Sequence, residues 1–222
     1  MTFFLHEARY RDLAPALEKL VTICGAGALG ANLAETLARM GLRHLRVIDR
    51  DRVEAHNLST QPWAQQDVGG LKARVLANAL YRAVGARVEA QSTVLTTENA
   101  GPLLSGSSVV IDAFDNLASR AAVGDTATTI GIPCLHIALG GAGDYGCGLW
   151  DGAYTAGAIS YPTASEARLE TLNAHADCDY PLTRPLALLV AAAAAEVLTS
   201  YLLGGQRRNF ECTLRDIRLS AT

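Results

Sequence analysis

Three closely spaced glycines give the first indication of chemistry. Gly25, Gly27 and Gly30 form a GxGxxG pattern directly after a short β-branched run. Such a turn lets the backbone approach a phosphate, and the helix after it offers unpaired N–H groups. Asp49 lies 19 residues beyond Gly30, where a carboxylate can accept from ribose hydroxyls. The pattern predicts a bound nucleotide and by itself favours NAD; a tight turn without a ligand is the alternative.

Polar residues farther along the chain could complete such a site. Asp115 and Asn116 follow an apolar run, and ligands bind at strand carboxyl ends in open α/β sheets. Lys72 could supply a cation. Each also has a purely structural interpretation: Lys72 as a solvated charge, Asp115 and Asn116 as a helix N-cap, and Arg120 as the ion-pair partner of Asp115 or Asp125.

The elements that must position these residues alternate between apolar runs and helical periods. Strands are expected over residues 20–24, 45–48, 87–94, 109–114 and 134–139, and helices over 28–40, 70–84, 98–104 and 116–130. Strands that alternate with helices indicate a parallel sheet. The prediction is an α/β fold: a Rossmann-like, doubly wound, mostly parallel sheet with helices on both faces and a C-terminal mixed-sheet extension.

The two ends of the chain are less regular. A helix interrupted or started by Pro15 is expected over residues 7–20, a mixed-sheet strand over 147–150, an apolar helix over 186–203 and a strand-like segment over 209–219. We expect one domain, 1–222. It comprises an N-terminal helical arm (1–18), a nucleotide-binding core (19–140) and a mobile loop (154–180) that carries Cys178.

Composition excludes several classes of partner and site. The 222 residues carry a formal net charge of −3, which gives no general attraction to nucleic acid. Five cysteines without a CxxC pair argue against a disulfide framework or a zinc site and for a reducing compartment. The N-terminus lacks a signal peptide pattern. Because the apolar helix contains Glu196, we expect a buried helix, no membrane partner and a cytoplasmic protein.

Several separated motifs, taken in order, resemble the ThiF/MoeB/HesA-type adenylating enzymes related to ubiquitin activators. The matching stretches are 49–61, Asp67-Val68-Gly69, Lys72, 112–116 and Arg120. The resemblance covers residues 19–140, with a weaker match to the end. It implies an ATP- and Mg²⁺-dependent homodimer. The paired CxxC zinc motifs of many relatives are absent from this sequence, so we expect no structural zinc. Such an enzyme adenylates the C-terminal carboxylate of a ubiquitin-like sulfur-carrier or modifier protein, or of a peptide, and releases pyrophosphate.

The resemblance also implies roles for individual residues. Gly27 and Ala28 would lie against the nucleotide, Asp49 would hold the ribose, and Lys72 and Asn57 would reach the phosphates. Asp115 would sit by magnesium and the triphosphate. The complete set of nucleotide-binding residues implied in this way is Gly25, Gly27, Ala28, Gly30, Asp49, Asp51, Asn57, Thr60, Gln61, Lys72, Asp115 and Asn116.

One departure from the family concerns phosphate binding. Many members have arginine at the position of Thr60, and its loss would weaken triphosphate binding unless another arginine replaces it. Arg9, Arg11, Arg50 and Arg52 are the candidates. Since the family also uses an arginine near the N-terminus of the partner subunit, we expect Arg11 to reach across a homodimer as a catalytic residue; the alternative is an exposed surface arginine.

Cys178 is the candidate for covalent chemistry, alongside the catalytic candidates Lys72, Asp115 and Arg11. Relatives that form a thioester or persulfide carry their cysteine in a similar loop, ahead of a similar helix. Against this role, the flanking Asp177 and Asp179 disfavour a thiolate. His175 could assist or be merely solvated. The remaining cysteines lie in strand-like runs and are expected to be core residues.

Two other functions remain open at the level of sequence. The glycine pattern alone would suit an NAD-dependent oxidoreductase, although little of the chain remains for a separate substrate domain. The substitution at Thr60 would suit a catalytically weak ATP-binding scaffold.

Overall fold

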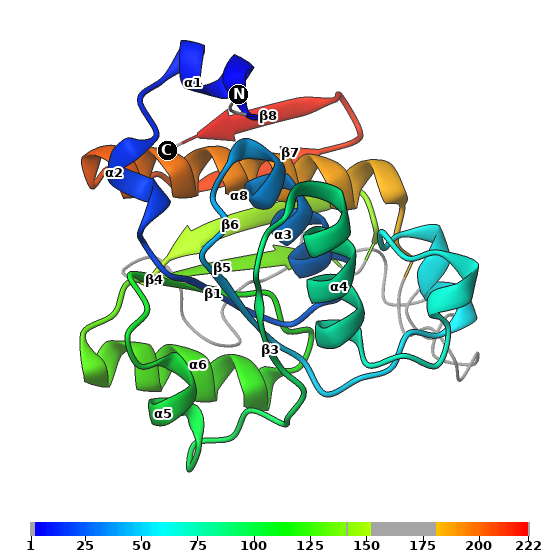
Figure 1. Cartoon of the computed structure of the whole chain (residues 1–222). Coiled ribbons are helices and arrows are strands. Elements are labelled where there is room, and N and C mark those ends of the chain that lie inside the picture. The colour runs from blue at the N-terminus through cyan, green and yellow to red at the C-terminus, as the bar shows by residue number, and fades with distance from the viewer. Residues whose placement is uncertain (1–2, 141, 152–180, 222) are drawn as a thin grey trace.

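A single mixed sheet of eight strands organises the computed structural model, which describes residues 3–140, 142–151 and 181–221 (Figure 1). The strand order is β3-β2-β1-β4-β5-β6-β7-β8. The parallel part comprises β1 (Val21–Cys24), β2 (Leu45–Ile48), β3 (Glu89–Gln91), β4 (Val109–Asp112) and β5 (Cys134–Leu139). The strands β6 (Tyr145–Trp150), β7 (Phe210–Thr213) and β8 (Arg218–Ala221) add antiparallel neighbours. The predicted fold class is confirmed.

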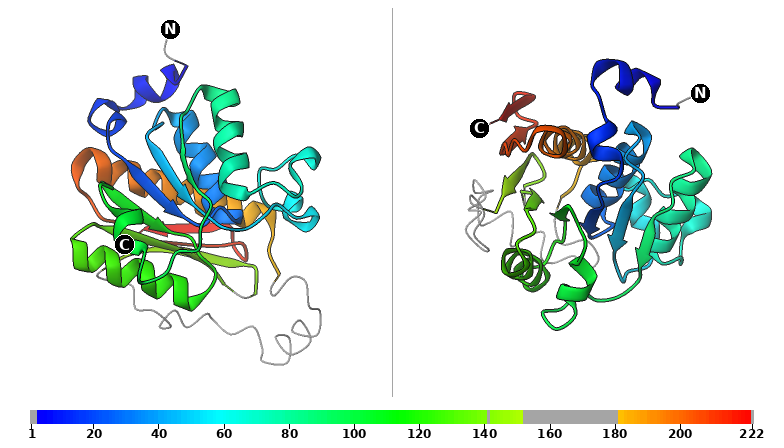
Figure 2. Two further views of the ribbon diagram at one scale, coloured as in Figure 1. Left: turned by 60° about the horizontal axis from the view of Figure 1, so that its bottom comes forward. Right: turned by 60° about the vertical axis from the view of Figure 1, so that its left-hand side comes forward.

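Helices cover both faces of this sheet, as Figure 2 shows. One face carries α3 (Ala28–Met40), α4 (Lys72–Val84) and α8 (Arg184–Gly204), and the other carries α5 (Ala100–Leu104) and α6 (Leu117–Ile130). The N-terminal arm forms α1 (Leu5–Tyr10) and α2 (Ala14–Leu17). The short 3₁₀ helices η1 (Ala55–Ser59) and η2 (Gln65–Asp67) follow β2. Two clusters of buried hydrophobic residues correspond to the two faces.

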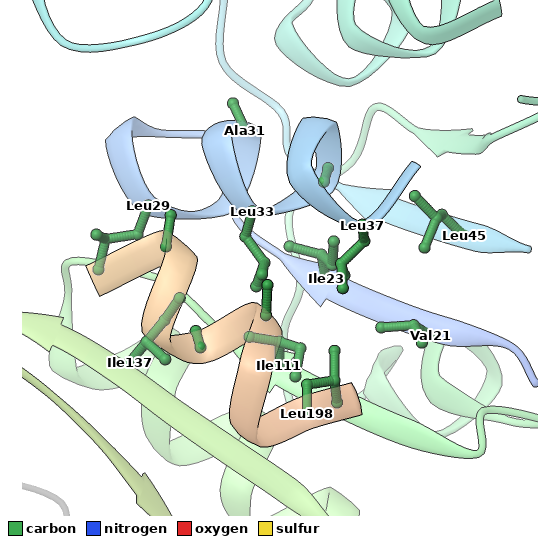
Figure 3. Close-up of a cluster of buried hydrophobic side chains, with 14 of the residues drawn as sticks. Val21, Ile23, Leu29, Ala31, Leu33, Leu37, Leu45, Ile111, Ile137 and Leu198 are labelled. Carbon is green, nitrogen blue, oxygen red and sulfur yellow. The ribbon is translucent and has the colours of Figure 1, made fainter. Parts of the chain in front are cut away.

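The larger cluster lies where α3 and α8 pack together on the sheet. In Figure 3, Leu29, Leu33 and Leu37 follow one another along the side of α3 that faces α8, and Leu37 lies beside Ile23 of β1. Their helical spacing puts these leucines on one face of α3, and burying that face stabilises the layer. The path of the glycine turn between β1 and α3 is therefore fixed by packing.

The apolar helix α8 is long enough to cross a membrane, with a mean hydropathy of 2.0 over its most apolar window. However, 61% of that window is buried inside the protein, mainly against α3 and the sheet. The prediction of a buried core helix is confirmed.

Several predicted boundaries differ from the structure. The expected strand over 87–94 is only β3, and the expected single strand over 209–219 is the β7–β8 hairpin. The helix expected over 7–20 is divided into α1 and α2, with Pro15 in the first turn of α2. The predicted loop at 154–180, which contains His175 and Cys178, lies outside the described residues.

Candidate active site

Glycine occupies the three positions of the turn for different structural reasons. Gly25 has φ +100°, and a Cβ there would lie 2.9 Å from the carbonyl oxygen of Ala113. A Cβ at Gly30 would collide with the carbonyl oxygen of Gly25. At Gly27, by contrast, a Cβ would meet nothing within 4 Å. Packing thus requires Gly25 and Gly30, whereas Gly27 borders open space at the start of α3, where a phosphate could approach the backbone.

Asp49 holds this turn in place from the end of β2. Its Oδ2 accepts from the backbone N–H of Ala26 at 2.6 Å, and its Oδ1 accepts from that of Asp51 at 2.7 Å. Burial raises the pKa of Asp49 and outweighs these two hydrogen bonds, which lower it. Sequence reasoning missed this supporting role. The ribose contact of Asp49 stays a prediction, for which each carboxylate oxygen keeps a second lone pair.

Lys72 is the first residue of α4 and is buried, with 9% of its surface exposed. Its backbone N–H donates to the carbonyl of Asp51 at 2.8 Å, and its Nζ lies 3.5 Å from Asp51 Oδ2. Asp51 is in turn bound to Asp49, so a continuous series of contacts joins the ammonium group to the glycine turn. The alternative of a solvated surface charge is wrong.

The segment after β2 contributes a second donor. Asn57 is buried in η1, where its Oδ1 accepts from the backbone N–H of Glu54 at 2.9 Å. Its Nδ2 has no acceptor among the described residues. The Asn32 side chain donates to the carbonyls of Ala28 at 2.6 Å and Thr60 at 2.9 Å. This bridge ties the end of η1 to the first turn of α3.

Asp115 and Asn116, at the start of α6, have different environments. Asn116 is the N-cap of α6, since its Oδ1 accepts from the backbone N–H of Ser119 at 2.9 Å. Asp115 is exposed and makes no hydrogen bond or ion pair within the described part of the chain. Its carboxylate therefore remains open toward solvent at the edge where β4 ends.

The predicted partners of Arg120 are wrong. Arg120 is buried and donates to Asp112 Oδ2 at 3.0 Å and to the carbonyl of Ile137 at 2.7 Å, rather than pairing with Asp115 or Asp125. Asp112 is fully buried at the end of β4, directly opposite His136 on β5, whose Nδ1 lies 2.9 Å from Asp112 Oδ2. The pairing of β4 with β5 thus selects the partner.

His136 is a polar residue that sequence reasoning missed, although a histidine inside the apolar run 134–139 was the available signal. Burial opposes its protonation, but hydrogen bonds to Asp112 and Asp151 outweigh burial and raise the pKa of His136. Asp151 also accepts from the backbone N–H of Cys134 at 2.7 Å. Arg120, Asp112, His136 and Asp151 therefore form a mutually compensating charge network inside the protein.

The candidate arginines differ in the hydrogen bonds and ion pairs that they make. Arg11 donates to both carboxylate oxygens of Glu196, at 3.0 and 2.8 Å, within its own chain. Arg52 donates to the carbonyl of Gly69, and Arg50 lies near Asp51. Sequence reasoning omitted Arg184, the first residue of α8. Its Nη1 donates to the carbonyl of Gln61 at 3.3 Å, next to Thr60.

The four described cysteines are buried and free: Cys24, Cys134, Cys147 and Cys212. Burial raises the pKa of each thiol, to about 11 for Cys212. The prediction that they are core residues is confirmed. The covalent role of Cys178 stays a prediction.

The family model described as "ThiF family" matches residues 5–219. The sulfur carrier protein ThiS adenylyltransferase of Bacillus subtilis is 36% identical over 133 residues, covering 58% of this chain and 39% of that protein. The sulfur carrier protein adenylyltransferase of Thermus thermophilus is 38% identical over 121 residues, covering 54% and 45%. The matches span less than half the length of these relatives.

Solved structures share the fold at low sequence identity. E. coli MccB with MccA-N7isoASN superposes with a TM-score of 0.76 at 16% identity, covering 98% of this chain and 69% of that one. E. coli tRNA N6-threonylcarbamoyladenosine dehydratase, TcdA, in complex with ATP gives 0.74 at 20% identity, covering 91% and 94%.

Proposed function

The chain belongs to the ThiF family, and from that membership we propose that it is an ATP-dependent adenylyltransferase. Its substrate is the C-terminal carboxylate of a ubiquitin-like sulfur-carrier or modifier protein, or of a peptide. The product is an acyl adenylate, with release of pyrophosphate. The names of the curated relatives, which include a SAMP-activating enzyme E1 of Haloferax volcanii at 36% identity, support this proposal.

The chemistry requires alignment and charge neutralisation more than a reactive side chain. A carboxylate oxygen attacks the α-phosphate and pyrophosphate leaves, so no protein nucleophile takes part. N–H groups at Gly27 and Ala28 would bind phosphate oxygens at the start of α3. Lys72 and the open amide of Asn57 would neutralise and orient the leaving pyrophosphate. Asp49 would accept from the ribose.

Magnesium fits the residues at the end of β4. Asp115 is an exposed carboxylate without a partner in the described structure, and Mg²⁺ prefers such oxygen ligands together with substrate phosphates. We propose that Asp115 holds Mg²⁺ with ATP. When bound, the ion would neutralise phosphate charge.

The observation that carries the proposal is the buried ammonium group of Lys72, joined through Asp51 and Asp49 to the glycine turn. An ion held at this position suits a triphosphate with a leaving pyrophosphate. An NAD-dependent oxidoreductase would share the turn, but it would need a hydride-transfer site for a second substrate. An ATP-binding scaffold would share the lysine without the reaction.

Exchange of labelled pyrophosphate into ATP, assayed with small proteins that end in Gly-Gly, separates these functions. Exchange supports the adenylyltransferase; ATP binding without exchange supports the scaffold, and NADH oxidation supports the oxidoreductase. Gly27→Ala is the matched variant, because its Cβ enters open space. We expect it to keep the melting temperature while weakening ATP binding roughly tenfold. Unchanged ATP binding would contradict the proposal that this turn binds a phosphate of ATP.

We further propose a cytoplasmic homodimer in which Arg11 acts on the partner's site. Arg11 would exchange its contact with Glu196 for the bound nucleotide. Arg11→Ala should then abolish exchange with the fold intact, while Glu196→Ala keeps exchange. If both variants keep full activity, Arg11 serves only to dock α1 on α8.

We propose that the Cys178 thiolate attacks the acyl adenylate to form a thioester with release of AMP, or that it carries a persulfide whose outer sulfur is transferred from a persulfide donor. Thiol trapping after incubation with ATP and the carrier protein tests the thioester, with Cys178→Ala as the control. A carrier–enzyme adduct that persists in Cys178→Ala would exclude the role.

A further inference from the structure

Cys134, His136 and Asp151 bring three metal-binding side chains together on the α6 side of the sheet. The thiol sulfur, one imidazole nitrogen and one carboxylate oxygen all lie within 4.8 Å of one another. Cys134 and His136 are two positions apart on β5, so their side chains lie on the same face of that strand. Asp151 directly follows β6, the antiparallel neighbour of β5. No other such group occurs within residues 3–140, 142–151 and 181–221.

The distances between these side chains are close to those of a tetrahedral zinc site. Zinc binds sulfur at about 2.3 Å and nitrogen or oxygen at about 2.0–2.2 Å, so its ligand atoms lie about 3.3–3.6 Å apart. His136 Nε2 lies 3.6 Å from Asp151 Oδ1, which already matches. The other pairs, within 4.8 Å, need to close by about 1 Å at most.

Hydrogen bonds orient the imidazole and the carboxylate from outside the group. His136 Nδ1 donates to Asp112 Oδ2 at 2.9 Å, which leaves Nε2 to face Asp151. Asp151 Oδ2 accepts from the backbone N–H of Cys134 at 2.7 Å, which leaves Oδ1 to face the imidazole. Histidine ligands of metal ions usually donate their second N–H to a carboxylate in this way. The group is therefore ordered before an ion binds.

The surroundings provide both space and a path for an ion. Gly124 of α6 lies over the imidazole, where a Cβ would come within 3.3 Å of His136 Cε1. Cys134 is fully buried, whereas the Asp151 side chain is 24% exposed. An ion can therefore enter from solvent at the carboxylate, and a water molecule can occupy the fourth position on that side.

We propose that Cys134, His136 and Asp151 bind Zn²⁺, with water as the fourth ligand. Thiolate and imidazole favour Zn²⁺ over Mg²⁺, which prefers oxygen ligands. Binding releases the thiol proton, and any proton on Nε2, to solvent. The ion, the thiolate, the Arg120 guanidinium and the carboxylates of Asp112 and Asp151 then sum to zero formal charge, so no buried charge lacks a counterion. Without the ion, His136 keeps its direct contacts with both carboxylates.

This site would clamp the end of β6 to β5. The absence of CxxC pairs predicts no structural zinc, but these ligands need no such motif, because Asp151 meets Cys134 across the strand pairing, 17 positions along the chain. The site is independent of the proposed adenylation. Its ligands lie on the α6 side of the sheet, whereas the glycine turn leads into α3 on the other side.

Metal binding by the full chain tests this site directly. The protein is made metal-free by dialysis against EDTA and titrated with Zn²⁺ against a chromophoric chelator, and with Co²⁺ as a spectroscopic substitute. The ligand variants are Cys134→Ala and Asp151→Asn, of which the second keeps an oxygen that accepts from the Cys134 N–H. The controls are Cys212→Ala, which removes another buried thiol, and Cys178→Ala, which removes the thiol of the proposed covalent chemistry.

We expect one Zn²⁺ per chain and a Co²⁺–thiolate charge-transfer band in the near ultraviolet. Cys134→Ala should abolish the band and weaken Zn²⁺ binding at least a hundredfold, and Asp151→Asn should weaken binding at least tenfold, since loss even of an outer partner costs about 10- to 100-fold. Zn²⁺ at about 100 times its Kd should raise the melting temperature of the full chain by roughly 5–10 °C. Both controls should keep the band, the affinity and the shift.

Absence of Zn²⁺ binding would overturn the proposal, and so would bound zinc without the thiolate band in the Co²⁺ form. A band that persists in Cys134→Ala, or that disappears in Cys178→Ala, would place the metal elsewhere. Circular dichroism shows whether each variant folds. If Cys134→Ala does not fold, unchanged zinc affinity in Asp151→Asn would still reject the site. None of these measurements uses pyrophosphate exchange, so their failure leaves the proposed function standing.

Discussion

Asp49 and Asp112 are buried carboxylates on the two strands that flank β1, at the same edge of the sheet. Asp49 accepts from the backbone N–H groups of Ala26 and Asp51. Asp112 instead binds the side chains of Arg120 and His136. The Asp49 side shapes a turn and leaves Gly27 open to a ligand, whereas the Asp112 side uses its charges inside the protein.

This difference shows that two buried carboxylates can have different structural roles, depending on their hydrogen-bond partners. A carboxylate that accepts from backbone groups fixes a loop, as Asp49 does here, and the nearby Lys72 ammonium group lies 3.5 Å from the exposed Asp51 rather than in a buried ion pair. A carboxylate that is paired with buried cations becomes part of the core, where an ion left without its partner is costly. In the proposed function, the Asp49 side therefore binds the nucleotide, and the buried Asp112 network supports the sheet beneath it.

Replacement of Asp112 should produce the largest effect on stability. Asp112→Asn removes the buried negative charge that pairs with the Arg120 guanidinium, and we expect a loss of about 3–5 kcal/mol in the free energy of unfolding. Asp49→Asn should cost less, about 1–3 kcal/mol, because it disturbs hydrogen bonds without stranding a cation. Urea unfolding of both variants measures the contrast. A larger loss for Asp49→Asn would reverse the assignment of support and function.

The same contrast explains what the sequence could predict. The bounds of α3, β2 and β5 match the predicted residue ranges, because helical period, β-branched runs and glycine stops are local signals. The glycine turn was found because it is a contiguous motif, and Lys72 was found through the resemblance to the family across separated motifs. The partners of Arg120 depend on the pairing of Asp112 with His136 across β4 and β5, a contact between residues 24 positions apart.

Two other elements had no local signal. The β7–β8 hairpin was predicted as a single strand, because its turn contains neither glycine nor proline and Ile217 adopts φ 51° instead. Arg184 was overlooked because its nearness to Gln61 joins residues 123 positions apart. Both features depend on tertiary packing, which local patterns in the sequence do not reveal.

Replacement of Lys72 should sharpen the functional side of the comparison. Lys72→Gln removes the buried cation, and we expect pyrophosphate exchange to fall about 10²- to 10³-fold, as for loss of a preorganised electrostatic contact. The free energy of unfolding should change little, since its ion-pair partner Asp51 is exposed. Arg74→Gln, which changes an exposed cation two residues farther along α4, is the matched control. Equal loss of exchange in both variants would indicate a general charge effect.

The pH dependence of the free energy of unfolding should reflect the Asp112 network, through the titration of His136. The pKa of His136 is raised because hydrogen bonds to Asp112 and Asp151 outweigh the opposing effect of burial. The folded state therefore binds a proton more tightly than the unfolded state does. This contribution is fully present below the ordinary histidine pKa of about 6.5 and is lost as pH rises through the raised pKa of the folded protein. We expect the free energy of unfolding to fall across that window, by up to about 1.4 kcal/mol per pH unit.

His136→Gln should remove this slope while leaving the buried Asp112–Arg120 pair in place. The matched control is His44→Gln, since His44 is exposed beside the start of β1, at the other end of that strand from the glycine turn, and should leave the slope unchanged. Hydrogen exchange of β5 amides across the same pH range would locate the effect. If the rate of pyrophosphate exchange into ATP falls with rising pH in parallel with the free energy of unfolding, the rigidity of the Asp112 network sets the geometry around Asp49. If activity stays flat while stability falls, the two carboxylates act independently, and the support is needed only to keep the protein folded.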